Sequence, residues 1–276
     1  MIEFLFLCIY FGSLYLMAMV SAVWLAIHPD KRFPFAELAD HSSCLFRREI
    51  QNDMSRMTQL RIKKWGYPQI PTISLQKDRL QTFFDIGSGA GHTTVLMLRG
   101  LFGTDTKITL SDIQPNEEAW IQFKSLDDDV DYVPYSVYNL KYENLTPGTC
   151  VSLFNSLHHL SEVEVDRILA TAADRGLVLF VMDAKRQPWF WSLAIPWFGW
   201  WFYLWLVLID IRREDWGMNP GLPLFRILIE PWIMTMDQII GSARRYSVGE
   251  VRRLASKHGF RVVLDSDLLM NYMLIG

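Results

Sequence analysis

The hydrophobic residues of this chain form two long uncharged runs and a series of short segments. The first run covers residues 4–27, which contain no charged side chain. A helix of that length would measure about 36 Å, more than the roughly 30 Å hydrocarbon core of a bilayer. The three residues before it include no base, whereas a cleaved signal peptide would have a basic n-region. We therefore expect a transmembrane anchor over residues 1–29, with a signal peptide or a buried helix as the alternatives.

Basic residues follow this run at once and predict the side of the membrane on which the rest lies. Lys31 and Arg32 come first, and more Lys and Arg follow up to residue 64. The positive-inside rule then places everything after residue 30 in the cytoplasm. Residues 30–79 are expected to form a linker or cap with a helix over 49–64, which Gly66 and two prolines would end.

The second uncharged run covers residues 187–209 and holds six of the eleven tryptophans. It is long enough to span a bilayer, but a crossing here would put the strands before and after it on opposite sides. Trp and Tyr favour the headgroup region of a membrane. We therefore expect a hydrophobic interfacial or re-entrant insertion at about 187–211, with a soluble lid or a true span as the alternatives.

Strands that alternate with helices begin at residue 80. The expected strands are 80–86, 107–112, 130–137, 150–154, 177–182, 260–264 and 268–275, and the helices between the earlier ones are 93–101, 116–123 and 165–173. Such alternation predicts an α/β fold with a doubly wound, mostly parallel seven-stranded sheet over 80–276. The last two strands have no helix between them, which favours an antiparallel hairpin at one edge.

A glycine-rich turn follows the first of these strands. Gly87, Gly89 and Gly91 form a G-x-G-x-G pattern, and Asp85 lies two residues before the first glycine. Turns of this kind, between a strand and a helix, let a ligand approach the backbone. A dinucleotide fingerprint would need glycine or alanine at position 92, where this chain has His92. An acid beside the turn also suits a cationic ligand better than a pyrophosphate.

A second acid, Asp112, ends the next strand, 21 residues after Gly91. A carboxylate at that place can accept hydrogen bonds from both hydroxyls of a ribose. Either motif alone is weak, and a structural turn with a solvated acid is the alternative. The two together, in this order and on these elements, favour a nucleoside-containing ligand.

With these motifs the chain resembles the class I S-adenosylmethionine-dependent methyltransferases, over residues 80–185 and more loosely over 240–276. The pattern after the fourth strand is similar to that of the small-molecule, quinone- and sterol-type branch. The resemblance implies a Rossmann-like fold and S-adenosylmethionine as the cofactor. The cofactor-binding residues that it implies are Asp85, Gly87, Ser88, Gly89, Gly91, Asp112, Ile113, Asn139, Leu140 and Asn155. Asn139 departs from the aspartate that the family often has there.

Methyl transfer to a hydroxyl or an acidic carbon is assisted by a base. His158 and His159 follow the fourth strand and are the candidates for this role, with local packing or capping as the alternative. Asp183 ends the fifth strand and is either a structural acid or a substrate contact.

Net charge and cysteine spacing limit the classes of partner that we expect. The formal net charge of −3 gives no general attraction to nucleic acid. The three cysteines lack the spacing of metal ligands, so neither a metal site nor a disulfide framework is expected. The hydrophobic insertion at 187–211 follows the fifth strand, at the end of the sheet where ligands bind. The expected activity is therefore membrane-associated O-, C- or N-methylation of a small lipophilic substrate, with membrane lipid as a partner and the oligomeric state open.

Three other functions compete with this one. The first is a catalytically silent protein that binds S-adenosylmethionine and serves as a membrane scaffold. The second is a protein methyltransferase, which the sequence Phe154-Asn155-Ser156-Leu157 disfavours because amide methylators have Asp or Asn followed by two prolines there. The third is a membrane-bound oxidoreductase, which His92 disfavours.

Overall fold

The computed structural model describes residues 2–28, 80–113, 116–133, 148–186, 239–266 and 270–276, with isolated positions at 33, 59, 62, 63, 66–68, 70, 145, 201 and 236. Its contacts divide the chain into two compact units. One unit is Met1–Phe46 with Arg186–Ser247, and the other is Arg47–Lys185 with Val248–Gly276. The domain predicted over residues 80–276 is therefore shared between the two units.

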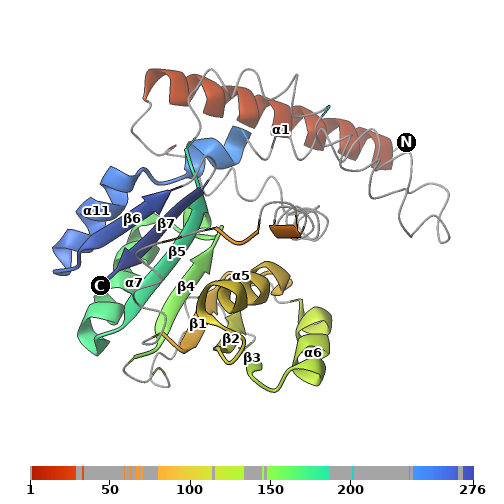
Figure 1. The fold of residues 1–276 in the computed structure, drawn as a ribbon. Coiled ribbons are helices and arrows are strands. Elements are labelled where there is room, and N and C mark those ends of the chain that lie inside the picture. The colour runs from red at the N-terminus through yellow and green to blue at the C-terminus, as the bar shows by residue number, and fades with distance from the viewer. Residues whose placement is uncertain are drawn as a thin grey trace. The chain divides into compact units, whose positions relative to one another are not determined.

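The second unit contains a seven-stranded sheet in the order β3-β2-β1-β4-β5-β7-β6 (Figure 1). The first five strands run parallel, and β7 is antiparallel to both of its neighbours. The predicted mostly parallel sheet with an antiparallel hairpin at its edge is confirmed. The strands are β1 (Thr82–Ile86), β2 (Lys107–Ser111), β3 (Val130–Val133), β4 (Cys150–Phe154), β5 (Val178–Ala184), β6 (Val262–Ser266) and β7 (Met270–Ile275).

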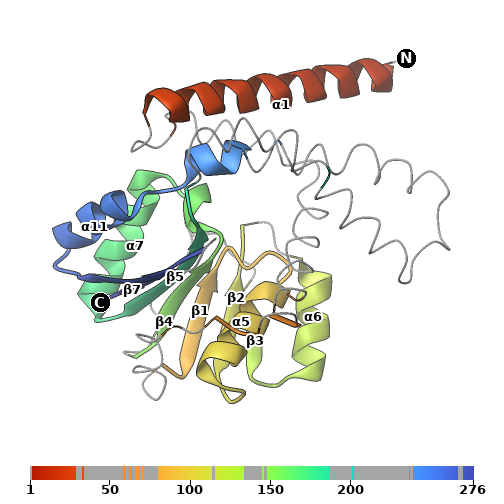
Figure 2. The ribbon, with the colours of Figure 1, turned by 45° about the horizontal axis from the view of Figure 1, so that its top comes forward.

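Helices cover both faces of this sheet, α5 and α6 on one and α7 and α11 on the other (Figures 1 and 2). A capping box begins α7, because Ser161 and Glu164 each accept a backbone N–H from the other. The left-handed Gly176 ends the same helix. The helices are α5 (His92–Phe102), α6 (Glu117–Leu126), α7 (Glu162–Arg175) and α11 (Val248–Lys257), and η4 (Leu157–His159) is a 3-10 turn.

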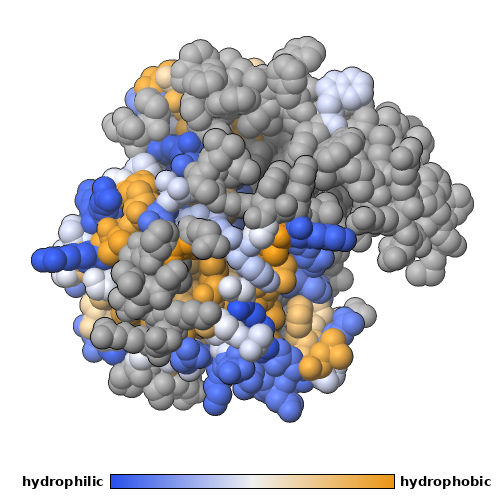
Figure 3. Space-filling view, viewed as in Figure 1, coloured by the Kyte–Doolittle hydropathy of each residue, from blue (hydrophilic) through white to orange (hydrophobic). Residues whose placement is uncertain are grey.

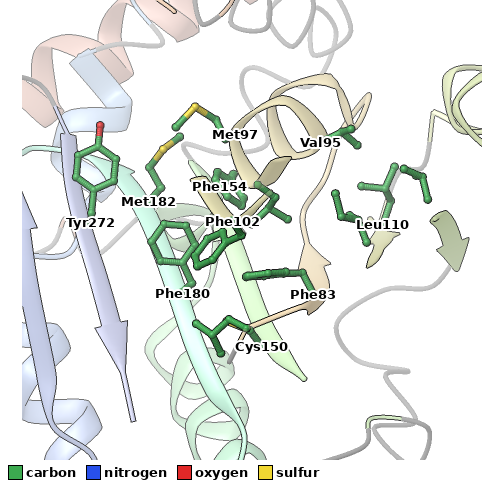
Figure 4. Packing of buried hydrophobic residues seen from close by; sticks show 14 of the residues in the cluster. Phe83, Val95, Met97, Phe102, Leu110, Cys150, Phe154, Phe180, Met182 and Tyr272 are labelled. Atoms are coloured by element: carbon green, nitrogen blue, oxygen red, sulfur yellow. The ribbon is translucent and has the colours of Figure 1, made fainter. Parts of the chain in front are cut away.

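Alternate residues of the buried strands pack on opposite faces, as the two-residue period of a strand requires. Phe180 and Met182 of β5 belong to the core on the α5 side, where the Phe180 ring contacts both Phe102 and Phe154 with centroids 5.6 Å apart (Figure 4). Leu179 and Val181 face α7 and α11. Burial on both sides fixes the register of the sheet and so the positions of the residues that follow its strands.

In the first unit, α1 (Ile2–Ile27) is a helix of 26 residues, as its uncharged run predicts. In the part of the chain that the structure describes, no helix is long and apolar enough to cross a membrane. The transmembrane anchor predicted for residues 1–29 is therefore not supported. Trp201 is the one described residue of the predicted insertion at 187–211, which otherwise lies outside the described residues, as does most of the helix predicted over 49–64.

Candidate active site

The glycine turn after β1 is bonded to the end of β2. The N–H groups of Gly87 and Ser88 both donate to the Ser111 carbonyl, at 2.9 and 3.0 Å. Gly87 has a φ of +75°, and a Cβ placed on it would lie 2.7 Å from the Cβ of Ser156. Any larger residue at this position would therefore combine backbone strain with a steric clash. The glycine at 87 lets the loop after β4 approach the turn after β1.

Asp85 holds this turn from inside the sheet. Its side chain is fully buried, and its two oxygens accept hydrogen bonds from Thr94 Oγ1 at 2.6 Å and Ser152 Oγ at 2.8 Å. Burial raises the pKa of Asp85 to about 7, although the hydroxyl donors act in the opposite direction. The contacts of this carboxylate are thus with the protein, and a direct or water-mediated contact with a ligand stays a prediction.

Asp112 braces the turn from the end of β2. Its Oδ2 accepts the Gly89 N–H at 2.7 Å, and Trp120 Nε1 donates to the Gly89 carbonyl at 2.9 Å. The next residue, Ile113, is exposed. The acid predicted to bind a ribose therefore lies against the glycine turn, and Ile113, also implied as a cofactor-binding residue, follows it in sequence. Asn139 and Leu140, the other implied cofactor-binding residues of this region, lie outside the described residues.

Asn155 follows β4 in a strained conformation. Its φ is +51°, which is uncommon for a residue other than glycine, and its N–H donates to the Met182 carbonyl at 2.6 Å. Among the described residues nothing donates to its buried Oδ1. The next residue, Ser156, donates from Oγ to the Ile86 carbonyl at 2.8 Å. Asn155 thus places a buried hydrogen-bond acceptor next to Ser156, which is hydrogen-bonded to the end of β1.

His158 and Asp183 form a buried pair. The ring Nδ1 lies 3.0 Å from Asp183 Oδ1, and the His158 backbone N–H donates to Oδ2 at 3.2 Å. A carboxylate that accepts from Nδ1 leaves the lone pair of the imidazole on Nε2. The His159 ring lies beside that of His158, with centroids 4.2 Å apart. Both predicted catalytic histidines therefore lie in the 3-10 turn after β4, and His158 has the acidic partner.

Several residues of the site were not predicted from the sequence. Thr94 and Ser152 donate hydrogen bonds to Asp85, and Trp120 donates one to the glycine turn. Ser156 lies against Gly87. These residue types are common in cores and caps, so only the fold identifies their roles. Among the described residues, no three His, Cys, Asp or Glu side chains come together as a metal site.

Comparison with protein-family models finds no match, and neither does comparison with curated proteins. Among solved structures, human N-acetylserotonin methyltransferase in complex with S-adenosylmethionine is similar, with a TM-score of 0.50 and 13% identity. The match covers 83% of this chain and 55% of the human one, so the chain spans little more than half of that protein. The fold is that of the S-adenosylmethionine-dependent methyltransferases.

Two further solved structures are less similar to this chain. One is an O-methyltransferase family protein from Burkholderia thailandensis, with a TM-score of 0.48 and 12% identity over 96% of this chain and 70% of that one. The other is an O-methyltransferase from neocarzinostatin biosynthesis in complex with S-adenosyl-L-homocysteine and 1,4-dihydroxy-2-naphthoic acid. Its TM-score is 0.47, with 16% identity over 87% of this chain and 58% of that one.

In this methyltransferase sheet, the glycine turn, Asp112, Asn155 and Asp183 all lie at or just after the carboxyl ends of parallel strands. Open parallel sheets bind ligands at that end, where the strand order reverses. The reversal here lies between β1 and β4, the two strands whose following loops meet at Gly87 and Ser156. The predicted site residues that the structure describes therefore lie at the same end of the sheet.

Proposed function

We propose that this protein transfers the methyl group of S-adenosylmethionine to a hydroxyl of a small lipophilic acceptor, with His158 as the general base. The observation that carries this proposal is the buried His158–Asp183 pair. His158 lies two residues after Ser156, whose hydroxyl donates a hydrogen bond to Ile86 in the strand before the glycine turn. A base with an acidic partner beside a nucleoside site suits proton removal from an acceptor hydroxyl.

The residues at the site fit this cofactor. The glycine turn has no side chain at Gly87 and so allows close approach of a ligand. Asp112 supplies the carboxylate that suits a ribose, and the buried Oδ1 of Asn155 suits a donor such as an ammonium group. When bound there, S-adenosylmethionine supplies an electrophilic methyl group on a cationic sulfur.

His158 and Asp183 divide the work of proton removal. Asp183 orients the imidazole through Nδ1, and Nε2 of His158 takes the proton of the acceptor hydroxyl. S-adenosylmethionine, held by the glycine turn, Asp112 and Asn155, would supply its methyl group to the deprotonated oxygen and leave as a neutral sulfide. Asp183 would balance the charge of the imidazolium.

We propose further that the protein acts at a membrane, with its catalytic unit on the cytoplasmic side. The support is the uncharged, Trp-rich segment at 187–209, which the chain inserts between β5 and α11, and the apolar run of α1. Lys31 and Arg32 after α1 favour the cytoplasmic leaflet, because its anionic lipids attract basic side chains. A lipophilic acceptor would be concentrated in such a membrane, which is why we propose this class.

The test is a transfer assay with methyl-labelled S-adenosylmethionine on membrane extracts, followed by separation of the organic phase. We expect label in organic-phase material with the wild-type chain. We expect none with Asp112→Ala, which should lose cofactor binding in calorimetry. His158→Ala should bind the cofactor within about threefold of wild type yet transfer label at least about 100-fold more slowly.

The same assay separates the silent scaffold from an enzyme. A scaffold would bind S-adenosylmethionine in calorimetry and give no labelled product in any fraction. Label that appears equally with wild type and His158→Ala would leave methyl transfer standing and remove the histidine from it. A chain that fails to bind the cofactor at all would overturn the proposal as a whole.

A further inference from the structure

The side chains of α1 that the structure describes divide into two faces. Those of one face are buried, with at most 4% of their surface exposed: Ala18, Ser21, Ala22 and Leu25. Those of the opposite face are large, apolar and between 40% and 65% exposed: Leu16, Met19, Val20, Val23 and Ile27. Spacings of three and four residues place each set along one side of a helix.

Contacts within the first unit connect α1 to other segments of that unit. Trp24 contacts the ring of Phe33, with centroids 6.2 Å apart, and the Phe33 N–H donates to the Ala243 carbonyl at 2.9 Å. Phe33 is itself buried. A helix that crossed a bilayer would meet lipid around much of its circumference, whereas this one has a side covered by protein over residues 18–25.

The exposed face carries no charge to keep it in water. Residues 12–27 contain no Asp, Glu, Lys, Arg or His. Hydrophobic side chains reach the surface over the C-terminal end of α1 (Figure 3). Contiguous apolar surface of this kind is rare on a protein that is surrounded by water, and marks a surface that another body covers.

The exposed face of α1 is too small to form a stable interface with a second copy of the chain. The whole helix is about 39 Å long and about 10 Å wide, so one face offers about 390 Å². Two copies packed through it would bury about 780 Å², below the roughly 1,200 Å² at which stable interfaces begin. A bilayer has no such lower limit, because lipid covers whatever apolar surface enters it.

The rest of the same unit carries side chains that suit the membrane surface. Trp201, in the uncharged segment at 187–209, is 65% exposed. Tyr15 is exposed on α1, and Lys31 and Arg32 follow the helix in sequence. Trp and Tyr favour the headgroup region, and bases favour anionic lipid.

We infer that α1 lies in the plane of a phospholipid bilayer, with its exposed face in the boundary between headgroups and acyl chains, and holds the protein on one leaflet without crossing it. This inference rests on the proposed membrane association and deepens it by naming the surface and its orientation. It does not depend on whether the site transfers methyl groups.

Flotation with vesicles of phosphatidylcholine and phosphatidylserine tests the surface, using the full chain. We expect the double variant Val20→Glu, Val23→Glu to bind vesicles at least about tenfold more weakly than wild type, because two charges would have to enter the apolar boundary. Val163→Glu is the matched control, since Val163 is 71% exposed on α7, and it should float like wild type. Calorimetry with S-adenosylmethionine checks that each variant keeps its cofactor site.

Depth measurements test the orientation. Leu16→Cys and Ile27→Cys, each in a chain with Cys8→Ser and Cys44→Ser, are labelled with a fluorophore and quenched by nitroxide lipids. We expect both labels at the same shallow depth. A spanning helix would separate them by about 16 Å, and that result overturns the in-plane arrangement.

Two other results overturn the inference. One is a wild-type chain that does not float. The other is self-association by light scattering that the double variant abolishes, while flotation is unchanged. Neither result touches the methyl-transfer proposal, which the labelled assay tests separately.

Discussion

Two aspartates lie near the carboxyl ends of parallel strands of one sheet and are both buried, yet their surroundings give them different chemistry. Asp85 in β1 accepts hydrogen bonds from two hydroxyls, those of Thr94 and Ser152. Asp183 in β5 accepts from the ring and the backbone N–H of His158. Burial is common to both, so the partner decides the role.

Hydroxyl partners let a carboxyl gain or lose a proton without breaking its contacts, because a hydroxyl can donate or accept. Asp85 can therefore hold the glycine turn in either form, and burial raises its pKa to about 7. An imidazole partner couples the charge of Asp183 to the protonation of a second group. The first arrangement suits a structural support, and the second suits a base.

The largest expected effect comes from Asp183→Asn. An amide can donate to Nδ1 and so favour the tautomer in which Nε2 carries the proton and cannot accept another. We expect the transfer rate at saturating cofactor to fall about 10²- to 10⁴-fold, with cofactor affinity in calorimetry within about threefold of wild type.

The chain offers a matched control for that variant. Asp166 also accepts from a histidine, since its Oδ1 lies 3.1 Å from His258 Nε2, but this pair lies near the surface between α7 and α11. Asp166→Asn should leave the transfer rate unchanged. Equal losses in the two variants would mean that Asp183 acts on stability alone.

Asp85→Asn should change the pH dependence of stability. The pKa of Asp85 is raised on folding, so the carboxyl contributes no penalty below about pH 4 and an increasing one as the pH rises to 7. We expect the variant to gain up to roughly 4 kcal/mol in free energy of unfolding, relative to wild type, between these pH values. Urea unfolding at both pH values measures this, and parallel curves for the two proteins would contradict it.

Gly87→Ala tests the close approach of the two loops. We expect a loss of roughly 1–3 kcal/mol in stability and a weaker affinity for S-adenosylmethionine, because Ser156 must move. Gly176→Ala is the control: its φ is +62° but nothing lies near the added Cβ, so it carries the backbone strain without the clash. The second change Ser156→Gly should restore part of the affinity, and no restoration would point to strain alone.

Thr94→Val should give the smallest effect. Removing one hydroxyl donor leaves Asp85 with Ser152 and raises the pKa of Asp85 further. We expect a loss of about 1–2 kcal/mol in free energy of unfolding at pH 8 and a smaller one at pH 5, where the carboxyl is protonated. A loss of the same size at both pH values would show that Thr94 acts by packing.

The sequence predicts the sheet well because the hydrophobic patterns of strands and helices are local. Residues that lie close together in the chain predict the glycine turn, Asp112, and the two histidines after the fourth strand. The partner of His158 was not, since Asp183 is 25 residues away and only the pairing of β4 with β5 brings them together. Contacts of this kind depend on the register between paired strands, which is difficult to predict from a single sequence.

The N-terminal run shows the opposite limit. Its length and lack of charge correctly predict the helix α1 but do not distinguish spanning from lying on a surface. That difference depends on what covers Ala18, Ala22 and Leu25, which is a tertiary contact. A residue buried against protein and one buried in lipid look alike in sequence.

The most direct test of the central claim compares the transfer rates of wild type and His158→Ala over the alkaline range, at saturating S-adenosylmethionine. Hydroxide can remove the acceptor proton in place of a side chain, so a missing base matters less as the pH rises. We predict that the deficit of His158→Ala shrinks by about tenfold for each pH unit until the acceptor ionises by itself. A deficit that stays constant with pH would contradict His158 as the base.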